Sequence, residues 1–158
     1  MFLAALILIA STALFFFYFQ TTCKRILRRE FDQEYFQTIV NANRLEFPSV
    51  RKAITEFDAP VDYPRFRMML KCDYLALTYL LKNAANVNQR YSSAERMLIL
   101  DFRLTFISLV ARHLLHLGEK PAILKLAAIL QYFANVVGER VNMVRFGNLT
   151  TSDYLLSL

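Results

Sequence analysis

Glycine, proline and cysteine are scarce in this 158-residue chain, which contains three, four and two of them respectively. No glycine-rich or serine-rich stretch is present, so the sequence has no obvious flexible linker and no glycine-rich phosphate loop. A Gly-x-Ser-x-Gly nucleophile turn is also missing. Cys23 and Cys72 are too few and too far apart for a zinc site. We therefore expect a protein that is not an enzyme and that uses no cofactor.

Histidine is equally scarce, since His113 and His116 are the only two in the chain. A spacing of three places both on one face of a helix, where such a pair can chelate a metal ion. The carboxylates that would complete such a site are not nearby in the sequence, and the Glu-x-x-His pairs of di-iron bundles are missing. We interpret both histidines as structural or surface residues and expect no metal site.

Charged residues make up only 20% of the chain, and the 13 acidic residues are scattered singly. This pattern offers no convincing pair of carboxylates for general acid–base catalysis. The formal net charge is +6, but much of the excess lies in one short basic cluster and the other basic residues alternate with acidic ones. A nucleic-acid interface needs a dedicated basic face with stacking aromatics, so we expect no nucleic-acid partner.

The most informative feature that is present is one long apolar run. Residues 2–19 contain no charged side chain, and the last five of them are aromatic. A helix of about 20 residues spans the hydrocarbon core of a bilayer. A cleaved signal peptide would begin with basic residues and end at a small-residue cleavage site, and this run does neither. We predict that residues 1–22 form a retained transmembrane anchor.

A basic cluster follows the run directly and consists of Lys24, Arg25, Arg28 and Arg29. No basic residue precedes the run, so the positive-inside rule predicts an external N-terminus and a cytoplasmic remainder. We also expect these side chains to contact anionic membrane lipids, each contributing about 1 kcal/mol near a charged surface. The compact anchor and the lack of long disordered tails favour a bacterial inner membrane.

Downstream of the anchor the apolar spacing is helical almost throughout, which predicts an all-α protein with one transmembrane helix. Apolar residues recur every fourth position at Leu27, Phe31, Tyr35 and Ile39. This stripe predicts that the anchor continues without a break into a juxtamembrane stalk helix over residues 23–44. Residues 45–62 contain two prolines and are expected to form a connector with a short helix capped by Ser49.

Residues 63–147 are predicted to form a helical bundle, and the cytoplasmic part is expected to contain about four helices. Its first helix is expected to follow an N-cap at Asp62 and to end near residue 85. The last helix begins near Pro121, which suits a first helical turn, and Gly147 is expected to end it. Residues 148–158 are predicted to be a C-terminal tail that packs down or binds a partner.

The sharpest local signal is a capping box made by Ser92 and Glu95, which opens an apolar helix expected to stop at Gly118. So little polar surface is typical of a helix at the centre of a bundle. A single narrow polar stripe runs along it, formed by Asp101, Thr105, Ser108, Arg112 and His116. We interpret the stripe, with Asp101 near Arg112, as a polar network that fixes helix register rather than as a catalytic site.

Two classes of function remain after these exclusions. The chain is 56% hydrophobic and 14% aromatic, more than the anchor and a small core require, which is typical of a buried interface. We therefore predict a single-pass accessory or scaffold subunit whose cytoplasmic domain docks on other subunits of a membrane complex, with self-association as a variant. The alternative is a bundle, possibly enzymatic, whose interior binds a lipid or quinone. Residues 121–138, with Lys125 as the only charge, leave open a further contact with the bilayer.

Overall fold

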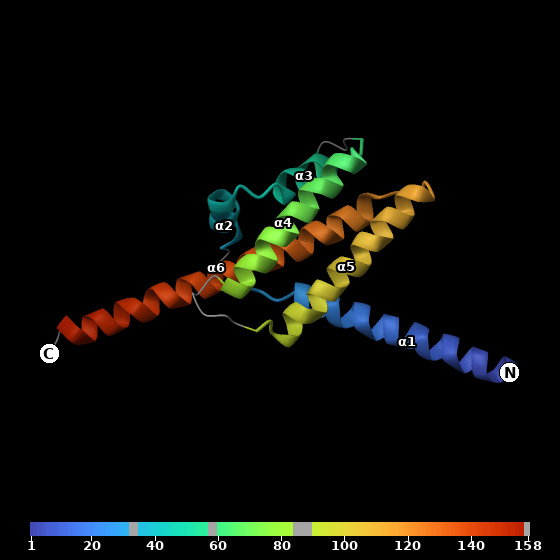
Figure 1. Ribbon diagram of the computed structural model, residues 1–158, viewed down its shortest axis with the longest axis horizontal. Helices are drawn as coiled ribbons and strands as arrows, with labels where there is room; N and C mark the ends of the chain where they lie inside the picture. Colours follow the sequence, from blue (N-terminus) through green and yellow to red (C-terminus); the bar gives the residue numbers. More distant parts are fainter. Residues whose placement is uncertain (32–34, 57–59, 84–89, 157–158) are drawn as a thin grey trace.

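The computed structural model describes residues 1–31, 35–56, 60–83 and 90–156, with side chains to residue 144. These ranges contain helices and no strand, which confirms the all-α prediction. The helices are α1 (Phe2–Leu27), α2 (Phe36–Asn43), α3 (Phe47–Thr55), α4 (Tyr63–Asn83), α5 (Ser93–Leu114) and α6 (Lys120–Leu156). Helices α2 to α6 are called the helical domain below (Figure 1).

Helix α6 lies at the centre of the helical domain, and every other helix packs on it (Figure 1). The sequence-based prediction gave the central position to the helix of residues 92–117, which is α5. Helix α6 takes it because its side chains are buried on nearly all sides from residue 122 to residue 138. Small residues such as Ala127 and Ala134 have no or almost no exposed surface, so neighbouring helices can approach α6 closely on several faces.

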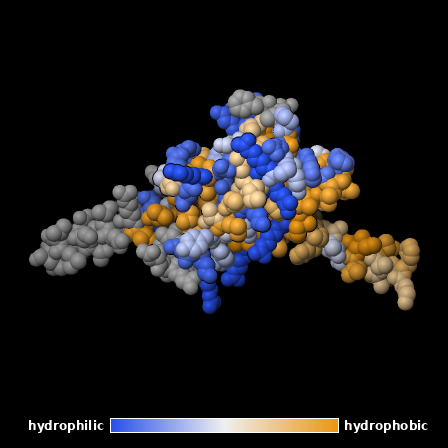
Figure 2. Space-filling model, turned by 45° about the horizontal axis from the view of Figure 1, so that its top comes forward, coloured by the Kyte–Doolittle hydropathy of each residue, from blue (hydrophilic) through white to orange (hydrophobic). Residues whose placement is uncertain are grey.

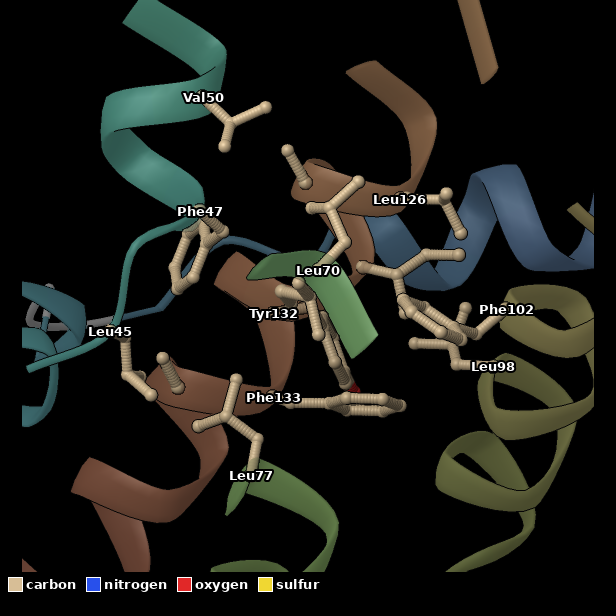
Figure 3. Packing of buried hydrophobic residues seen from close by; sticks show 14 of the residues in the cluster. Leu45, Phe47, Val50, Leu70, Leu77, Leu98, Phe102, Leu126, Tyr132 and Phe133 are labelled. Atoms are coloured by element: carbon tan, nitrogen blue, oxygen red, sulfur yellow. The ribbon is translucent and has the colours of Figure 1, made fainter. Parts of the chain in front are cut away.

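Close-packed apolar side chains fill the space between α4, α5 and α6 (Figure 3). Leu70 and Leu77 come from α4, Leu98 comes from α5, and Phe133 comes from α6. All four are fully buried, and each such side chain contributes about 1.5–3 kcal/mol relative to an exposed position. Phe47 extends the same core under α3.

Two helices have the length and hydropathy to cross a membrane, α1 and the Lys120–Val144 part of α6. Only 6% of the most apolar stretch of α1 is buried, and the helix projects from the helical domain as a hydrophobic rod (Figures 1 and 2). By contrast, 72% of the corresponding stretch of α6 is buried against other helices. Burial among the other helices thus accounts for the apolar character of α6, whereas most of the apolar stretch of α1 is left uncovered by the described residues.

The uninterrupted stalk helix expected from the anchor to residue 44 is not observed. Helix α1 ends at Leu27, and a separate helix begins at Phe36. The apolar residues of the predicted stripe instead reach α6 from the two sides of this break. The ring of Phe31 packs edge-on against Tyr132, with centroids 5.5 Å apart, and Tyr35 lies directly against Gly138. Burial against α6 therefore outweighs the helix that the spacing alone favours.

Helix α3 begins earlier than predicted, and Ser49 does not cap it. The backbone N–H groups of Glu46 and Phe47 donate to Asp73 Oδ2, at 2.8 and 2.6 Å. Asp73 belongs to α4, so the cap comes from a neighbouring helix rather than from the adjacent sequence. Burial raises the pKa of Asp73, and the two backbone hydrogen bonds partly offset that rise.

The ends of α5 and α6 also differ from the sequence-based prediction. Helix α5 ends at Leu114, before Gly118, because His116 adopts the left-handed conformation with φ of 53°. The Leu117 N–H donates to the Arg112 carbonyl at 2.8 Å, which completes a Schellman motif around His116. Helix α6 runs past Gly147 to Leu156, since one glycine costs a helix interior only about 1 kcal/mol.

Candidate functional site

The predicted polar stripe of α5 divides into a buried part and an exposed end. Asp101 has no exposed surface and Thr105 is 7% exposed, while Ser108 and Arg112 are half-buried. His116 lies beyond the end of α5 and is exposed, so it is not part of the stripe. The four remaining residues face the place where α1 meets α5 and α6.

At that meeting point a three-residue cluster joins α1, α5 and α6. The Lys125 ammonium donates to Asp101 Oδ1 at 2.7 Å and to Gln20 Oε1 at 2.8 Å. The amide of Gln20 in turn donates to Asp101 Oδ1 at 3.3 Å. Because a buried carboxylate is costly without a cation and hydrogen bonds, this cluster holds the base of α1 at one place on the helical domain.

Asp101 was expected to lie near Arg112, but it forms its ion pair with Lys125. Arg112 lies farther along α5 and donates to the Gly118 carbonyl at 3.2 Å. Asp101 Oδ2 is buried and accepts no hydrogen bond within the described residues. Gln20 and Lys125 were not predicted as site residues, although Lys125 is the one charge in the apolar segment 121–138 and this isolation was a usable signal.

A pocket of about 270 Å³ opens next to this cluster, between α1 and the hairpin formed by α5 and α6. Its polar lining comes from the stripe and the cluster, namely Gln20, Thr105, Ser108, Arg112 and Lys125. Phe16, one turn before Gln20 on α1, forms part of its apolar lining. The pocket thus lies where the apolar run of α1 meets its first polar residue.

A second hollow, called the α4–α5 groove below, has a volume of about 300 Å³. It exists because α4 and α5 both pack on α6 and contact each other only sparsely. It is lined by Lys71, Tyr74, Leu75, Phe102, Arg103, Phe106 and Ile107. The rings of Tyr74 and Phe102 stack with centroids 4.1 Å apart, which fixes an aromatic floor.

The rim of the α4–α5 groove is apolar and basic. Leu75 is 56% exposed and Ile107 is 65% exposed, so large aliphatic side chains face solvent on both helices. Lys71 and Arg103 are exposed beside them, and no acidic residue lines the groove within the described part of the chain. The guanidinium of Arg67 lies 5.7 Å from the centre of the Phe106 ring and adds a further positive charge.

One residue of the basic cluster after the apolar run, Arg29, contacts the helical domain. Arg29 makes an ion pair with Glu139 of α6 at 3.1 Å and lies over the Phe31 ring at 4.9 Å. Lys24, Arg25 and Arg28 are exposed. Contact of these three residues with membrane lipids stays a prediction.

The two histidines do not act together. His113 Nδ1 lies 2.9 Å from Glu119 Oε1, and its ring stacks on Tyr63 with centroids 3.7 Å apart. This contact lowers the pKa of Glu119. His116 is in the turn after α5, so the helical spacing that would bring the two rings together is lost. Within the described residues no three potential ligands gather into a metal-binding group.

No protein-family model matches this chain, and neither a curated protein nor a solved structure is significantly similar to it. The α4–α5 groove, the pocket beside α1 and the projecting helix are the features of the described residues that point to a function. Neither hollow was predicted as a site, because each depends on the distance between helices that are far apart in the sequence.

Proposed function

We propose that this protein is a single-pass, non-catalytic accessory or scaffold subunit of a membrane complex. Helix α1 is the anchor, its N-terminus lies outside, and the helical domain lies in the cytoplasm. The membrane in this proposal is a bacterial inner membrane. The exposure of α1 and the basic residues that follow it support this topology. The burial of the apolar part of α6 supports a single crossing.

The α4–α5 groove is the docking site in this proposal. Its occupant is an amphipathic helix of a partner subunit, with an apolar face for Leu75 and Ile107 and acidic residues at its flanks. Helices α4 and α5 both pack on α6 and contact each other only sparsely, and an apolar groove between two helices can bind the apolar face of an amphipathic helix. The charges of Lys71 and Arg103 favour acidic flanks and disfavour a second copy of this basic rim.

Photo-crosslinking tests this assignment directly. A photoreactive amino acid replaces Ile107 in the full-length chain, and crosslinked peptides from native membranes are sequenced. We expect crosslinks to an amphipathic, acidic helix of another membrane-complex subunit. Crosslinks between two copies of this chain would establish self-association instead, and the absence of any crosslink from Ile107 would overturn docking in the groove.

A matched pair of charge variants adds a second test. Ile107→Glu places a negative charge in the groove, whereas Met68→Glu places one on α4 at a residue that is 62% exposed and does not line the groove. Native mass spectrometry of the particle extracted in a mild detergent should lose the partner subunit with Ile107→Glu and retain it with Met68→Glu. Equal retention by both variants would contradict the proposal.

Topology has an independent reporter in the exposed Cys72, since Cys23 is buried. A membrane-impermeant maleimide added to intact cells or spheroplasts should leave Cys72 unlabelled, and should label it after the membrane is opened. Labelling in intact spheroplasts would place the helical domain outside and refute the predicted orientation.

The alternative of a hydrophobic ligand inside the bundle has less support. Helix α6 occupies the centre, and the space between α4, α5 and α6 is filled by Leu70, Leu98 and Phe133 (Figure 3). A quinone or lipid tail would have to displace these fully buried side chains.

A further inference from the structure

The pocket between α1 and the α5–α6 hairpin lies beside the end of the uncharged run of α1. Phe16 and Gln20 both line it, and between them the uncharged run of residues 2–19 ends. If α1 is the anchor, as proposed above, the phosphate groups of the adjoining leaflet lie at this height. The location therefore restricts the ligand to molecules present at the membrane surface.

The polar groups that face the pocket are suited to an anion. Lys125 uses two of its three donors on Asp101 and Gln20, which leaves one N–H. Arg112 donates from Nη1 to Gly118 and has further guanidinium N–H groups. Lys125 and Arg112 are cations and Asp101 is a carboxylate, so the net charge of these groups around the pocket is positive.

Two hydroxyl groups in the pocket have no hydrogen-bond partner within the described part of the chain. Thr105 and Ser108 make no hydrogen bond to any described residue, although Thr105 is only 7% exposed. Both hydroxyl groups line the pocket and can donate a hydrogen bond to a ligand there. Phosphate oxygens accept hydrogen bonds from hydroxyl, ammonium and guanidinium groups alike, so the donors that line this pocket suit a phosphate.

Exposed leucines lie in the turn that joins the two helices of the hairpin beside the pocket. The turn between α5 and α6 exposes Leu114, Leu115 and Leu117, and it extends from the helical domain on the same side as α1 (Figure 1). Hydrophobic surface covers this end of the domain and the projecting part of α1 (Figure 2). A phosphate in the pocket would thus have acyl chains beside it that rest on these leucines and on Phe16.

We propose that this pocket binds the phosphate group of an anionic phospholipid from the leaflet next to the helical domain. Arg112 and Lys125 pair with the phosphate, and Thr105 and Ser108 donate hydrogen bonds to it. The site rests on the proposed anchoring of α1 and is independent of docking in the α4–α5 groove. A bound lipid also fixes the angle between α1 and the helical domain, because its phosphate contacts α5 and α6 while its chains lie along α1.

The test is native mass spectrometry of the full-length protein, delipidated in mild detergent and titrated with phosphatidylglycerol or phosphatidylcholine. The wild-type protein should retain phosphatidylglycerol preferentially. Arg112→Gln should reduce this binding about tenfold or more, because a hydrogen bond to a charged group contributes roughly 1.5–3 kcal/mol. Ser108→Ala should reduce it several-fold, and Arg65→Gln, at an exposed residue of α4 that lines neither hollow, should leave it unchanged.

Further measurements distinguish the ways in which the lipid-site proposal could fail. Equal binding by wild type and by both pocket variants would overturn the site, provided that unfolding temperatures show all proteins folded. Inorganic phosphate that binds as tightly as the lipid would assign the pocket to a soluble phosphate and overturn the lipid source. Flotation with liposomes tests the anchor itself, and crosslinking from Ile107 tests docking, so failure of either proposal is distinguishable from failure of this one.

Discussion

Replacing Gly138 by alanine is expected to destabilise the fold, although alanine is the better helix former. A Cβ at this position would lie 2.1 Å from Tyr35 Cβ and 3.4 Å from Tyr35 Cα. Ordinary carbon–carbon contacts are about 3.5–4.0 Å, so the backbone before α2 would have to move by more than 1 Å. No flexible side-chain end is available to relieve the clash.

The segment that would have to move is held to α6 on both sides of Gly138. The Phe36 N–H donates to Asn135 Oδ1 at 2.9 Å, and the Asn142 amide donates to the Tyr35 hydroxyl at 2.8 Å. Overpacking a well-fitted site costs about 1–3 kcal/mol, and these restraints favour the upper end. Subtracting about 1 kcal/mol for the gain in helix propensity leaves a loss of about 2 kcal/mol. For a chain of this size that corresponds to a fall in Tm of roughly 4–8 °C.

Thermal unfolding followed by far-ultraviolet circular dichroism in mild detergent measures this change, and Gly118→Ala is the matched control. A Cβ at Gly118 meets nothing within 4 Å, so its Tm should stay within about 2 °C of the wild type. A Gly138→Ala protein that melts at or above the wild-type temperature would refute the reasoning, because it would mean that α2 is not pinned against α6.

Three further changes test the other contacts by the same measurement. Ser92→Ala removes one half of the capping box and should cost about 1 kcal/mol; no change in Tm would contradict the cap. Lys125→Met leaves Asp101 buried without its cation and should cost about 3 kcal/mol, and adding Asp101→Asn should recover part of this loss; an unchanged Tm for the single variant would show that the ion pair is not needed. The hydrogen bond from His113 lowers the pKa of Glu119 below its ordinary value of 4.5. The ionised carboxylate therefore stabilises the fold at pH values above 4.5, and this contribution disappears as the pH falls through the lowered pKa. Glu119→Gln should therefore melt below the wild type at about pH 6, and this difference should shrink as the pH falls below 4.5; a difference that stays constant with pH would exclude the pair as its cause.

Local signals in the sequence were reliable where the interaction is itself local. The apolar run predicted a transmembrane anchor over residues 1–22, and α1 has the length and hydropathy of a membrane span. The capping box at Ser92 and Glu95 is observed with both of its hydrogen bonds. The helical spacing of apolar residues predicted an all-α protein. Each of these depends on residues within a few turns of one another, whose geometry the backbone alone determines.

Long-range partners could not be read from the same patterns. The cap of α3 is an aspartate 26 residues away from Phe47, and the cation of Asp101 is Lys125 on another helix. The break after α1 arises because burial against α6 is worth more than a continued helix. Both hollows are spaces between helices that pack on α6 and leave gaps elsewhere. The sequence by itself determined that the protein is helical and that its first segment is long and apolar enough for a bilayer. Tertiary packing decided where some helices break and which polar groups meet, because both depend on how side-chain volumes fill the space around α6.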